Sequence, residues 1–213
     1  ENEPMGGYDP YSSSKGAAEI AIASWRRSFF NPSDYGMKHH VALASVRAGN
    51  VIGGGDWALD RIIPDCIKAL EAGKGIDIRS PKAIRPWQHV LEPLSGYMLL
   101  ATKMWEEPTK YCEGWNFGPR AESITPVWDV ATDVIKNYGS GKLNDISNSN
   151  VLHEAKLLML DISKAKFQLG WEPRMNIHQC IELTVDWYKK YQNVDSIYML
   201  CLNEIFKFTS YKK

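Results

Sequence analysis

A tyrosine and a lysine lie four residues apart near the start of the chain, in the segment YDPYSSSKGAAE. Four residues make just over one helical turn, so Tyr11 and Lys15 would project from the same face of a helix. A phenol with an unperturbed pKa of about 10 is a poor base at neutral pH, but a nearby ammonium favours the phenolate. The two residues could therefore act as a general base and its electrostatic support.

The same spacing also arises by chance, so by itself it is a weak signal. A second copy, Tyr138 and Lys142 in YGSGK, contains two glycines at a predicted helix end, and we interpret it as a loop. For Tyr11 and Lys15 the alternative is two polar residues at the start of an amphipathic helix. The surrounding sequence has to decide between these interpretations.

The elements that would position the first pair are a helix and a strand. Asp9 can cap a helix and Pro10 can occupy its first position, so we expect a helix over residues 11–30. The apolar run VALASVR, residues 41–47, is typical of a buried parallel strand and leads into the glycine-rich loop AGNVIGGGD. Ligands favour the carboxyl ends of such strands.

Further along, strands and helices alternate, which predicts an α/β architecture with mainly parallel strands. The segment 144–151 is polar and is predicted to be a loop. We expect helices at 64–72, 91–105, 127–138, 163–169, 177–191 and 196–208, and strands at 75–81, 114–119 and 156–160.

Charge and cysteine usage narrow the function classes. Lys+Arg and Asp+Glu balance at 25 each, which gives no reason to expect nucleic acid or an anionic membrane as a partner. The four cysteines lie far apart without a C-x-x-C pair, which argues against a zinc site or a disulfide framework. No apolar run approaches the roughly 18 residues of a membrane span, and no signal peptide is evident. We expect a cytoplasmic protein.

Five separated blocks, in order, resemble the extended short-chain dehydrogenase/reductase family of sugar-nucleotide enzymes. They are YDPYSSSKGAAE, SVRAGNVIGGGDW, IRPWQHVLEPLSGY, GWNFGP and LDISKAKFQLGWEP. Within that family the sequence is most similar to the branch that dehydrates CDP-glucose. One departure is that His153 and Glu154 stand where many members have an arginine. Trp171 of the last block is most simply a core residue.

The resemblance implies an NAD-dependent 4,6-dehydratase that converts CDP-glucose to CDP-4-keto-6-deoxyglucose. Tyr11 would take the proton from the sugar C4 hydroxyl while the C4 hydride passes to NAD, and Lys15 would bind the nicotinamide ribose. Both would therefore contact the cofactor. The 4-keto group would acidify C5–H, and water would be lost across C5 and C6.

The resemblance also implies a binding site for the nucleotide sugar. Asn50 matches an asparagine that hydrogen-bonds a diphosphate oxygen, and with Val51 it lies in the stretch against the nicotinamide. Arg85 matches a diphosphate-binding arginine, and Arg61 and Arg79 match positions near the nucleotide. Guanidinium groups offer phosphate two parallel hydrogen bonds. For Asn50 a turn residue, and for the arginines solvated surface residues, remain the alternatives.

The implied fold is the C-terminal half of a Rossmann-like parallel sheet plus a smaller α/β substrate-binding domain. Residues 1–55 and 85–123 would belong to the NAD-binding domain, and 56–84 and 124–213 to the substrate domain. The glycine-rich dinucleotide turn and the dehydration acid and base would lie in roughly 120 to 150 residues before Glu1. The chain alone is therefore expected to be inactive, within a parent that forms a homodimer or higher homo-oligomer.

Two other functions remain open. One is a sugar-nucleotide 4-epimerase, which also uses the tyrosine and the lysine but needs no acid for the C6 hydroxyl. The other is a non-catalytic fragment that binds nucleotide sugars or serves dimerisation.

Overall fold

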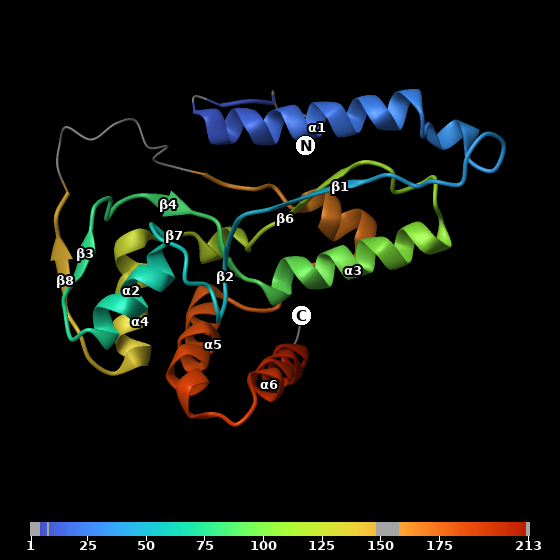
Figure 1. Cartoon of the computed structure of the whole chain (residues 1–213). Helices are drawn as coiled ribbons and strands as arrows, with labels where there is room; N and C mark the ends of the chain where they lie inside the picture. Colours follow the sequence, from blue (N-terminus) through green and yellow to red (C-terminus); the bar gives the residue numbers. More distant parts are fainter. Residues whose placement is uncertain (1–4, 8, 148–157, 212–213) are drawn as a thin grey trace. The chain divides into compact units, whose positions relative to one another are not determined.

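The computed structural model describes residues 5–7, 9–147 and 158–211 (Figure 1). It is an α/β structure in which helices and short strands alternate along the chain. The chain divides into two compact units. Unit 1 consists of Glu1–Arg47, Leu94–Phe117 and Asp161–Trp171, and unit 2 consists of Ala48–Pro93, Gly118–Leu160 and Glu172–Lys213.

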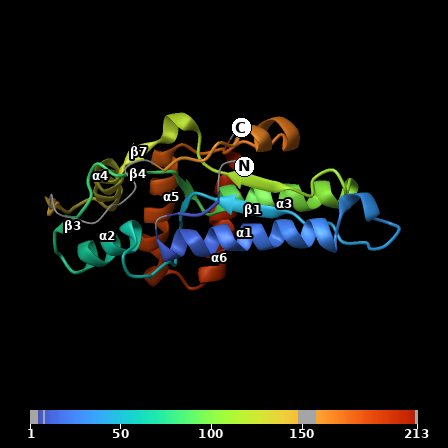
Figure 2. The same cartoon turned by 90° about the horizontal axis from the view of Figure 1, so that it is seen from above.

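Unit 1 is built around the long helix α1 and the strand β1. Helix α1 begins where the Asp9 side chain accepts a hydrogen bond from the Ser12 N–H, with Pro10 at the first position. It runs beside β1, as Figure 2 shows, and the Arg26 Nε donates to the Leu43 carbonyl at 2.8 Å. The elements of unit 1 include α1 (Pro10–Ser28), η1 (Pro32–Asp34), β1 (Ser45–Ala48), most of α3 (Leu91–Glu106), β6 (Gly114–Phe117) and η3 (Ala165–Leu169).

The core of unit 1 is aromatic. Trp115, Phe117 and Trp171 are buried, and the rings of Phe117 and Trp171 meet edge to face at 4.9 Å. The indole N–H of Trp171 donates to the Ser95 hydroxyl, so the polar end of the buried ring is satisfied. The core position predicted for Trp171 is confirmed.

Several large apolar side chains of unit 1 are exposed instead of contributing to this core. They lie on α1, at its C-terminal cap and on α3, and are Ile20, Trp25, Phe29, Leu94, Met98 and Trp105.

Unit 2 holds two short parallel strand pairs and one antiparallel pair. β2 (Asn50–Ile52) pairs in parallel with β5 (Trp87–His89), and β3 (Ile76–Ile78) pairs in parallel with β8 (Leu143–Asp145). β4 (Ile84–Arg85) pairs antiparallel with β7 (Thr125–Pro126). The prediction of mainly parallel strands in an α/β fold is confirmed.

The helices of unit 2 follow the apolar period of 3.6 residues. Helix α2 (Ile62–Glu71) and helix α4 (Val127–Tyr138) pack against each other and against β3 (Figure 1). Asn176 caps α5 (Ile177–Lys190), which is buried on one side and packs on α4. The remaining helical elements of unit 2 are η2 (Ala121–Ser123), η4 (Tyr191–Asn193) and α6 (Ile197–Ser210).

Several sequence predictions need correction. Residues 144–145, predicted as loop, form part of β8, and 158–160, predicted as strand, have no regular structure. The rest of that predicted strand, like the departure at His153 and Glu154, lies outside the described residues. Strands β2, β4, β5 and β7 were not predicted, because two or three residues show no period.

Residues 161–171 pack within unit 1, and the predicted domain bounds stay a prediction. The functional roles assigned to the two domains stay a prediction. In the described part of the chain, no helix combines the length and the apolar character that a membrane crossing requires.

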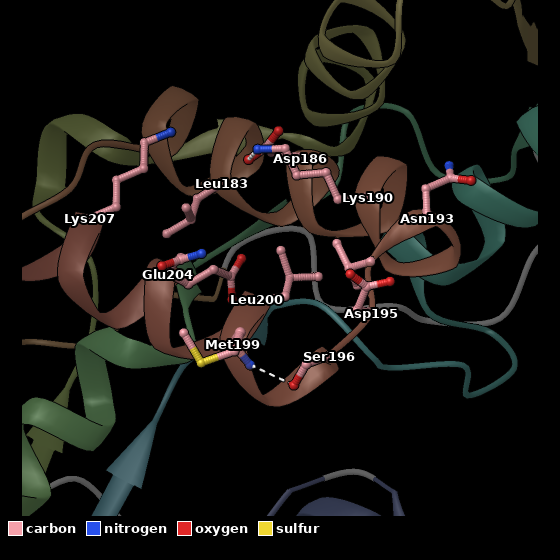
Figure 3. A pocket seen from close by; sticks show the side chains of 12 residues that line it. Leu183, Asp186, Lys190, Asn193, Asp195, Ser196, Met199, Leu200, Glu204 and Lys207 are labelled. Carbon is pink, nitrogen blue, oxygen red and sulfur yellow. Dashed lines mark hydrogen bonds and ion pairs between the residues drawn. The ribbon is translucent and has the colours of Figure 1, made fainter.

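A hollow lies in unit 2 between α5, η4 and α6 (Figure 3). Charged side chains line it from α5, from α6 and from the segment between η4 and α6, among them Asp186, Lys190, Asp195, Glu204 and Lys207. Lys190 pairs with Asp186 at 2.7 Å, and Lys207 pairs at 3.3 Å with Glu182. The Oε1 atom of Glu204 is buried and has no hydrogen-bond partner in the described residues.

This environment favours the neutral form of Glu204. Burial and, second, the charge of Asp186 raise the pKa of the Glu204 carboxyl to about 7, although Lys207 and Lys190 oppose the shift. The folded state therefore binds more protons than the unfolded state between the ordinary pKa of a glutamate and about 7. The contribution of Glu204 to folding stability is fully present below the ordinary pKa of a glutamate. It is lost as the pH rises through about 7, the pKa of Glu204 in the folded state.

We expect Glu204→Gln to remove this loss of folding stability at higher pH. The variant should melt at a higher temperature than the parent at about pH 8 and depend less on pH between about 5 and 8. Thermal unfolding at a series of pH values measures both effects. Glu182→Gln, which removes an exposed carboxylate from the adjoining helix, is the control and should retain the pH slope. An unchanged slope in Glu204→Gln would contradict the assignment.

Candidate functional site

Helix α1 places Tyr11 and Lys15 side by side. The Lys15 Nζ lies over the Tyr11 ring, 5.3 Å from its centroid, and the Tyr11 side chain is exposed. The predicted common helix face is therefore confirmed, while the catalytic role stays a prediction. The second copy of the spacing behaves differently, because Tyr138 ends α4 and Gly139 caps it with a φ of 105°. Lys142 lies beyond that helix, as expected for a loop.

The Asp9 carboxylate keeps the start of α1 in place. It accepts hydrogen bonds from the backbone N–H of Ser12 at 3.0 Å and from the Ser12 hydroxyl at 2.7 Å. These hydrogen bonds lower the pKa of Asp9, against a small opposing effect of burial. An ionised cap also suits the positive end of the helix dipole. The position of Tyr11, in the first turn, follows from this cap.

Asn50 and Val51 open strand β2 in unit 2 and are half-buried. The Asn50 N–H donates to the Pro86 carbonyl at 2.9 Å, next to Arg85 in the chain. The structure thus brings Asn50, Val51 and Arg85 together on neighbouring backbone segments. The Arg85 Nη1 donates to the Ile84 carbonyl at 2.8 Å, and the residue is half-buried.

The loop that follows β2 is packed on α5. An added Cβ at Gly54 would lie 2.2 Å from the Trp187 ring, so only glycine fits this approach. The Tyr188 hydroxyl donates to the Asp56 carbonyl at 2.5 Å. These contacts hold the glycine-rich loop at the carboxyl end of a parallel strand, where ligands bind in α/β proteins.

Arg61 and Arg79 meet the same loop from two sides. The Arg61 Nε lies 3.7 Å from the Asp56 carboxylate, and the Arg79 Nη2 lies 2.8 Å from that of Asp60. Both arginines are largely exposed, at 62% and 67% of their side-chain surface. Exposed ion pairs of this kind contribute about 0–1 kcal/mol and exchange readily for an anionic ligand.

Sequence reasoning missed three charged residues that lie within the units. In unit 1, Glu19 of α1 pairs with Arg47 of β1 at 2.7 Å. In unit 2, the buried Glu92 accepts hydrogen bonds from the N–H groups of Arg174 and Met175 at 2.8 and 2.7 Å. Burial nevertheless raises the pKa of Glu92. The signal for Glu19 was its spacing, four residues after Lys15 on the same helix.

His89 is a structural residue of unit 2. It is fully buried, its Nδ1 accepts a hydrogen bond from the Leu91 N–H at 3.3 Å, and burial lowers its pKa to about 4. The imidazole is therefore neutral near pH 7. Among the residues that the structure describes, no cluster of histidine, cysteine, aspartate or glutamate side chains could hold a metal ion. The hollow beside α6 includes none of the seven predicted site residues.

Comparison with known proteins gives relatives among sugar-nucleotide enzymes. The chain is 48% identical over 210 residues to the CDP-glucose 4,6-dehydratase of Salmonella typhimurium, which covers 99% of this chain and 58% of that protein. The chain thus spans somewhat more than half of the length of this relative. No protein-family model matches the chain.

Solved structures share the fold. The dTDP-glucose 4,6-dehydratase of Bacillus anthracis, in complex with NAD, superimposes with a TM-score of 0.72 and 22% identity over 89% of this chain and 55% of that one. The UDP-glucuronic acid 4-epimerase of Bacillus cereus, in complex with UDP-glucuronic acid and NAD, superimposes with a TM-score of 0.68 and 21% identity. The match covers 86% of this chain and 53% of that one. By sequence the chain is similar to a CDP-glucose 4,6-dehydratase, and by fold it is similar to solved sugar-nucleotide dehydratases and epimerases, the class of enzyme that its motifs indicate.

Proposed function

We propose that this chain is part of an NAD-dependent sugar-nucleotide 4,6-dehydratase that converts CDP-glucose to CDP-4-keto-6-deoxyglucose. The observation that supports it most is the 48% identity with the CDP-glucose 4,6-dehydratase of Salmonella typhimurium, which extends over nearly the whole chain. The chain contributes the tyrosine and lysine pair and the arginines of the diphosphate site. By itself it is inactive.

The donor set in unit 1 suits the ribose of a nicotinamide cofactor. Lys15 is exposed and forms no ion pair with any residue that the structure describes, so its ammonium can donate to ribose hydroxyls. The NAD complex of the Bacillus anthracis relative supports this cofactor. When bound, NAD supplies a reversible hydride acceptor. In unit 2, Asn50 and Val51 would contact its nicotinamide end.

The proton chemistry begins at Tyr11. Its phenolate oxygen accepts the proton of the sugar C4 hydroxyl, and the adjacent Lys15 ammonium stabilises the phenolate. Oxidation at C4 would produce a ketone that acidifies C5–H, and water would be lost across C5 and C6. Return of the hydride removed from C4 to C6, with a proton to C5, would then give the 6-deoxy product. None of the seven residues proposed here serves as the acid or base of that elimination.

The diphosphate would be bound in unit 2. Arg85 and Asn50 lie on neighbouring segments, one offering a guanidinium and the other an uncharged amide. Arg61 and Arg79 are held by Asp56 and Asp60 and would exchange these carboxylates for the nucleotide. Four donor side chains from one unit thus fit a nucleoside diphosphate.

Further proposals follow from the same relatives. Residues 1–55 and 85–123 act in NAD binding and 56–84 and 124–213 in substrate binding, in a cytoplasmic homodimer or higher homo-oligomer. A 4-epimerase is the second candidate, because the Bacillus cereus epimerase shares the fold. At 21% identity that likeness concerns the fold alone, so the dehydratase is favoured.

Titration and product analysis test the proposal. Isothermal titration of the chain with CDP, CDP-glucose and NAD should show binding of the two cytidine nucleotides, without formation of a 4-keto sugar. A chimera that joins the chain to the part of the Salmonella typhimurium enzyme that it does not match should form the 4-keto product from CDP-glucose and NAD. A 4-epimer in its place would favour the epimerase, and no product would contradict both.

In the chimera, Tyr11→Phe should lower kcat by about 100- to 10,000-fold, because the variant cannot accept the C4 proton. The affinity for CDP should stay close to that of the parent. Steady-state kinetics and titration measure the two effects. Tyr35→Phe, which alters a tyrosine outside α1, is the matched control. A turnover that Tyr11→Phe leaves unchanged would refute the catalytic role.

Arg85→Ala should weaken the affinity for CDP by about 10- to 100-fold, since a charge-assisted hydrogen bond to the diphosphate is lost. Titration of the 213-residue chain is sufficient for this measurement. Lys82→Ala removes an exposed positive charge three residues away and should leave the affinity nearly unchanged. Equal affinities of Arg85→Ala and the parent would remove Arg85 from the site.

A further inference from the structure

Three side chains follow one another along one face of α1 at intervals of four residues. They are Tyr11, Lys15 and Glu19, and neighbours at this spacing contact each other on a helix. Helical side chains lean toward the N-terminus of their helix. Lys15 follows this tendency, with its ammonium over the Tyr11 ring. By the same tendency a free Glu19 carboxylate would lean toward Lys15 and attract the ammonium away from Tyr11.

Two donors from strand β1 hold Glu19 instead. Its Oε2 accepts hydrogen bonds from the Arg47 Nη2 at 2.7 Å and from the Ser45 hydroxyl at 2.8 Å. The side chains of Arg47 and Glu19 are only 23% and 16% exposed, so solvent and salt screen this pair weakly. Burial raises the pKa of Glu19, but the hydrogen bonds from Arg47 and Ser45 outweigh it and the pKa is lowered. Glu19 is thus an ionised carboxylate with its own partner.

The surroundings of Arg47 keep it at this carboxylate. An added Cβ at Gly114 of β6 would lie 2.8 Å from the Arg47 Nη2, so the guanidinium occupies the space that the glycine leaves. About two turns further along α1, the Arg26 Nε donates a hydrogen bond to the Leu43 carbonyl. The helix and the segment that contains β1 are therefore joined at two points, and Glu19 cannot move toward Lys15 without breaking its hydrogen bonds to Arg47 and Ser45.

We propose that Arg47, assisted by Ser45, is a positioning residue for the tyrosine and lysine pair. By occupying Glu19, it leaves the Lys15 ammonium beside Tyr11. The catalytic consequence rests on the proposed function, whereas the position of Lys15 does not. A structural ion pair without this role would stabilise unit 1 and leave Lys15 unaffected.

The 213-residue chain tests the position of Lys15 directly. Because the Lys15 Nζ lies over the Tyr11 ring, the adjoining ε-CH2 protons should resonate upfield of those of a solvated lysine. Arg47→Met should abolish most of this upfield shift, because Glu19 then pairs with Lys15. Glu19→Gln breaks the same ion pair but removes the competing carboxylate, so the shift should persist. In the double variant Arg47→Met/Glu19→Gln the shift should return.

The contrast between the two single variants is decisive. Both lose a partly buried ion pair and should melt at lower temperature than the parent. If both lose the upfield shift equally, or if Arg47→Met retains it, the proposal is overturned. Gly114→Ala displaces the guanidinium without removing a charge and should weaken the shift in the same direction as Arg47→Met.

Kinetics in the chimera test the catalytic consequence. Arg47→Met should lower kcat by about 10- to 100-fold and move the rise of the rate to higher pH, and the added Glu19→Gln change should restore both. The catalytic consequence would be overturned if both single variants lost rate in proportion to their drop in melting temperature and the pH profile stayed the same. If the unaltered chimera forms no product, the proposed function fails, while the resonances of Lys15 still decide the positioning role.

Discussion

The helical repeat of α1 is the constraint on which the proposed chemistry depends. Its start is fixed by the Asp9 cap and by Pro10, and every side chain that follows takes its direction from that start. Insertion or deletion of one residue between Tyr11 and Lys15 would turn the lysine by about 100° about the helix axis, away from the face that carries the tyrosine. A phenol and an ammonium become neighbours here because a regular backbone leaves them no other arrangement, and the exposed position of Tyr11 leaves its hydroxyl open to a ligand.

A helix nevertheless does not decide which partner a charged group takes. Lys15 lies between Tyr11 and Glu19, and the choice between them depends on Arg47, which comes from a strand. In unit 2, by contrast, charged side chains have partners that a ligand can replace. There Arg61 and Arg79 pair with aspartates in exposed positions, where the pairs are weak and a phosphate can replace a carboxylate. The Glu92 carboxylate is buried against two backbone N–H groups, where replacement would leave these donors unsatisfied.

The relatives connect these local arrangements to a reaction. Identity of 48% with a CDP-glucose 4,6-dehydratase is a statement about sequence, and the likeness to solved structures below 25% identity is a statement about fold. The chain spans 58% of that relative. The groups found in this chain suit deprotonation of a sugar hydroxyl and binding of a diphosphate. Both tasks need charged side chains with accessible heads, which is how Tyr11, Lys15, Arg61 and Arg79 are placed.

The sequence by itself determined the long helices and the spacing of Tyr11 and Lys15, because caps and the apolar period of 3.6 residues act over short range. Blocks of residues that keep their order also predicted the likeness to sugar-nucleotide enzymes. Strands β2, β4, β5 and β7 of two or three residues were decided only in the tertiary structure, since a strand that short exists only through its partner. The pair of Glu19 with Arg47 joins residues 28 positions apart. Such a contact depends on the placement of strand β1 beside helix α1 in the fold, and no local sequence pattern predicts a pair of residues so far apart in the chain.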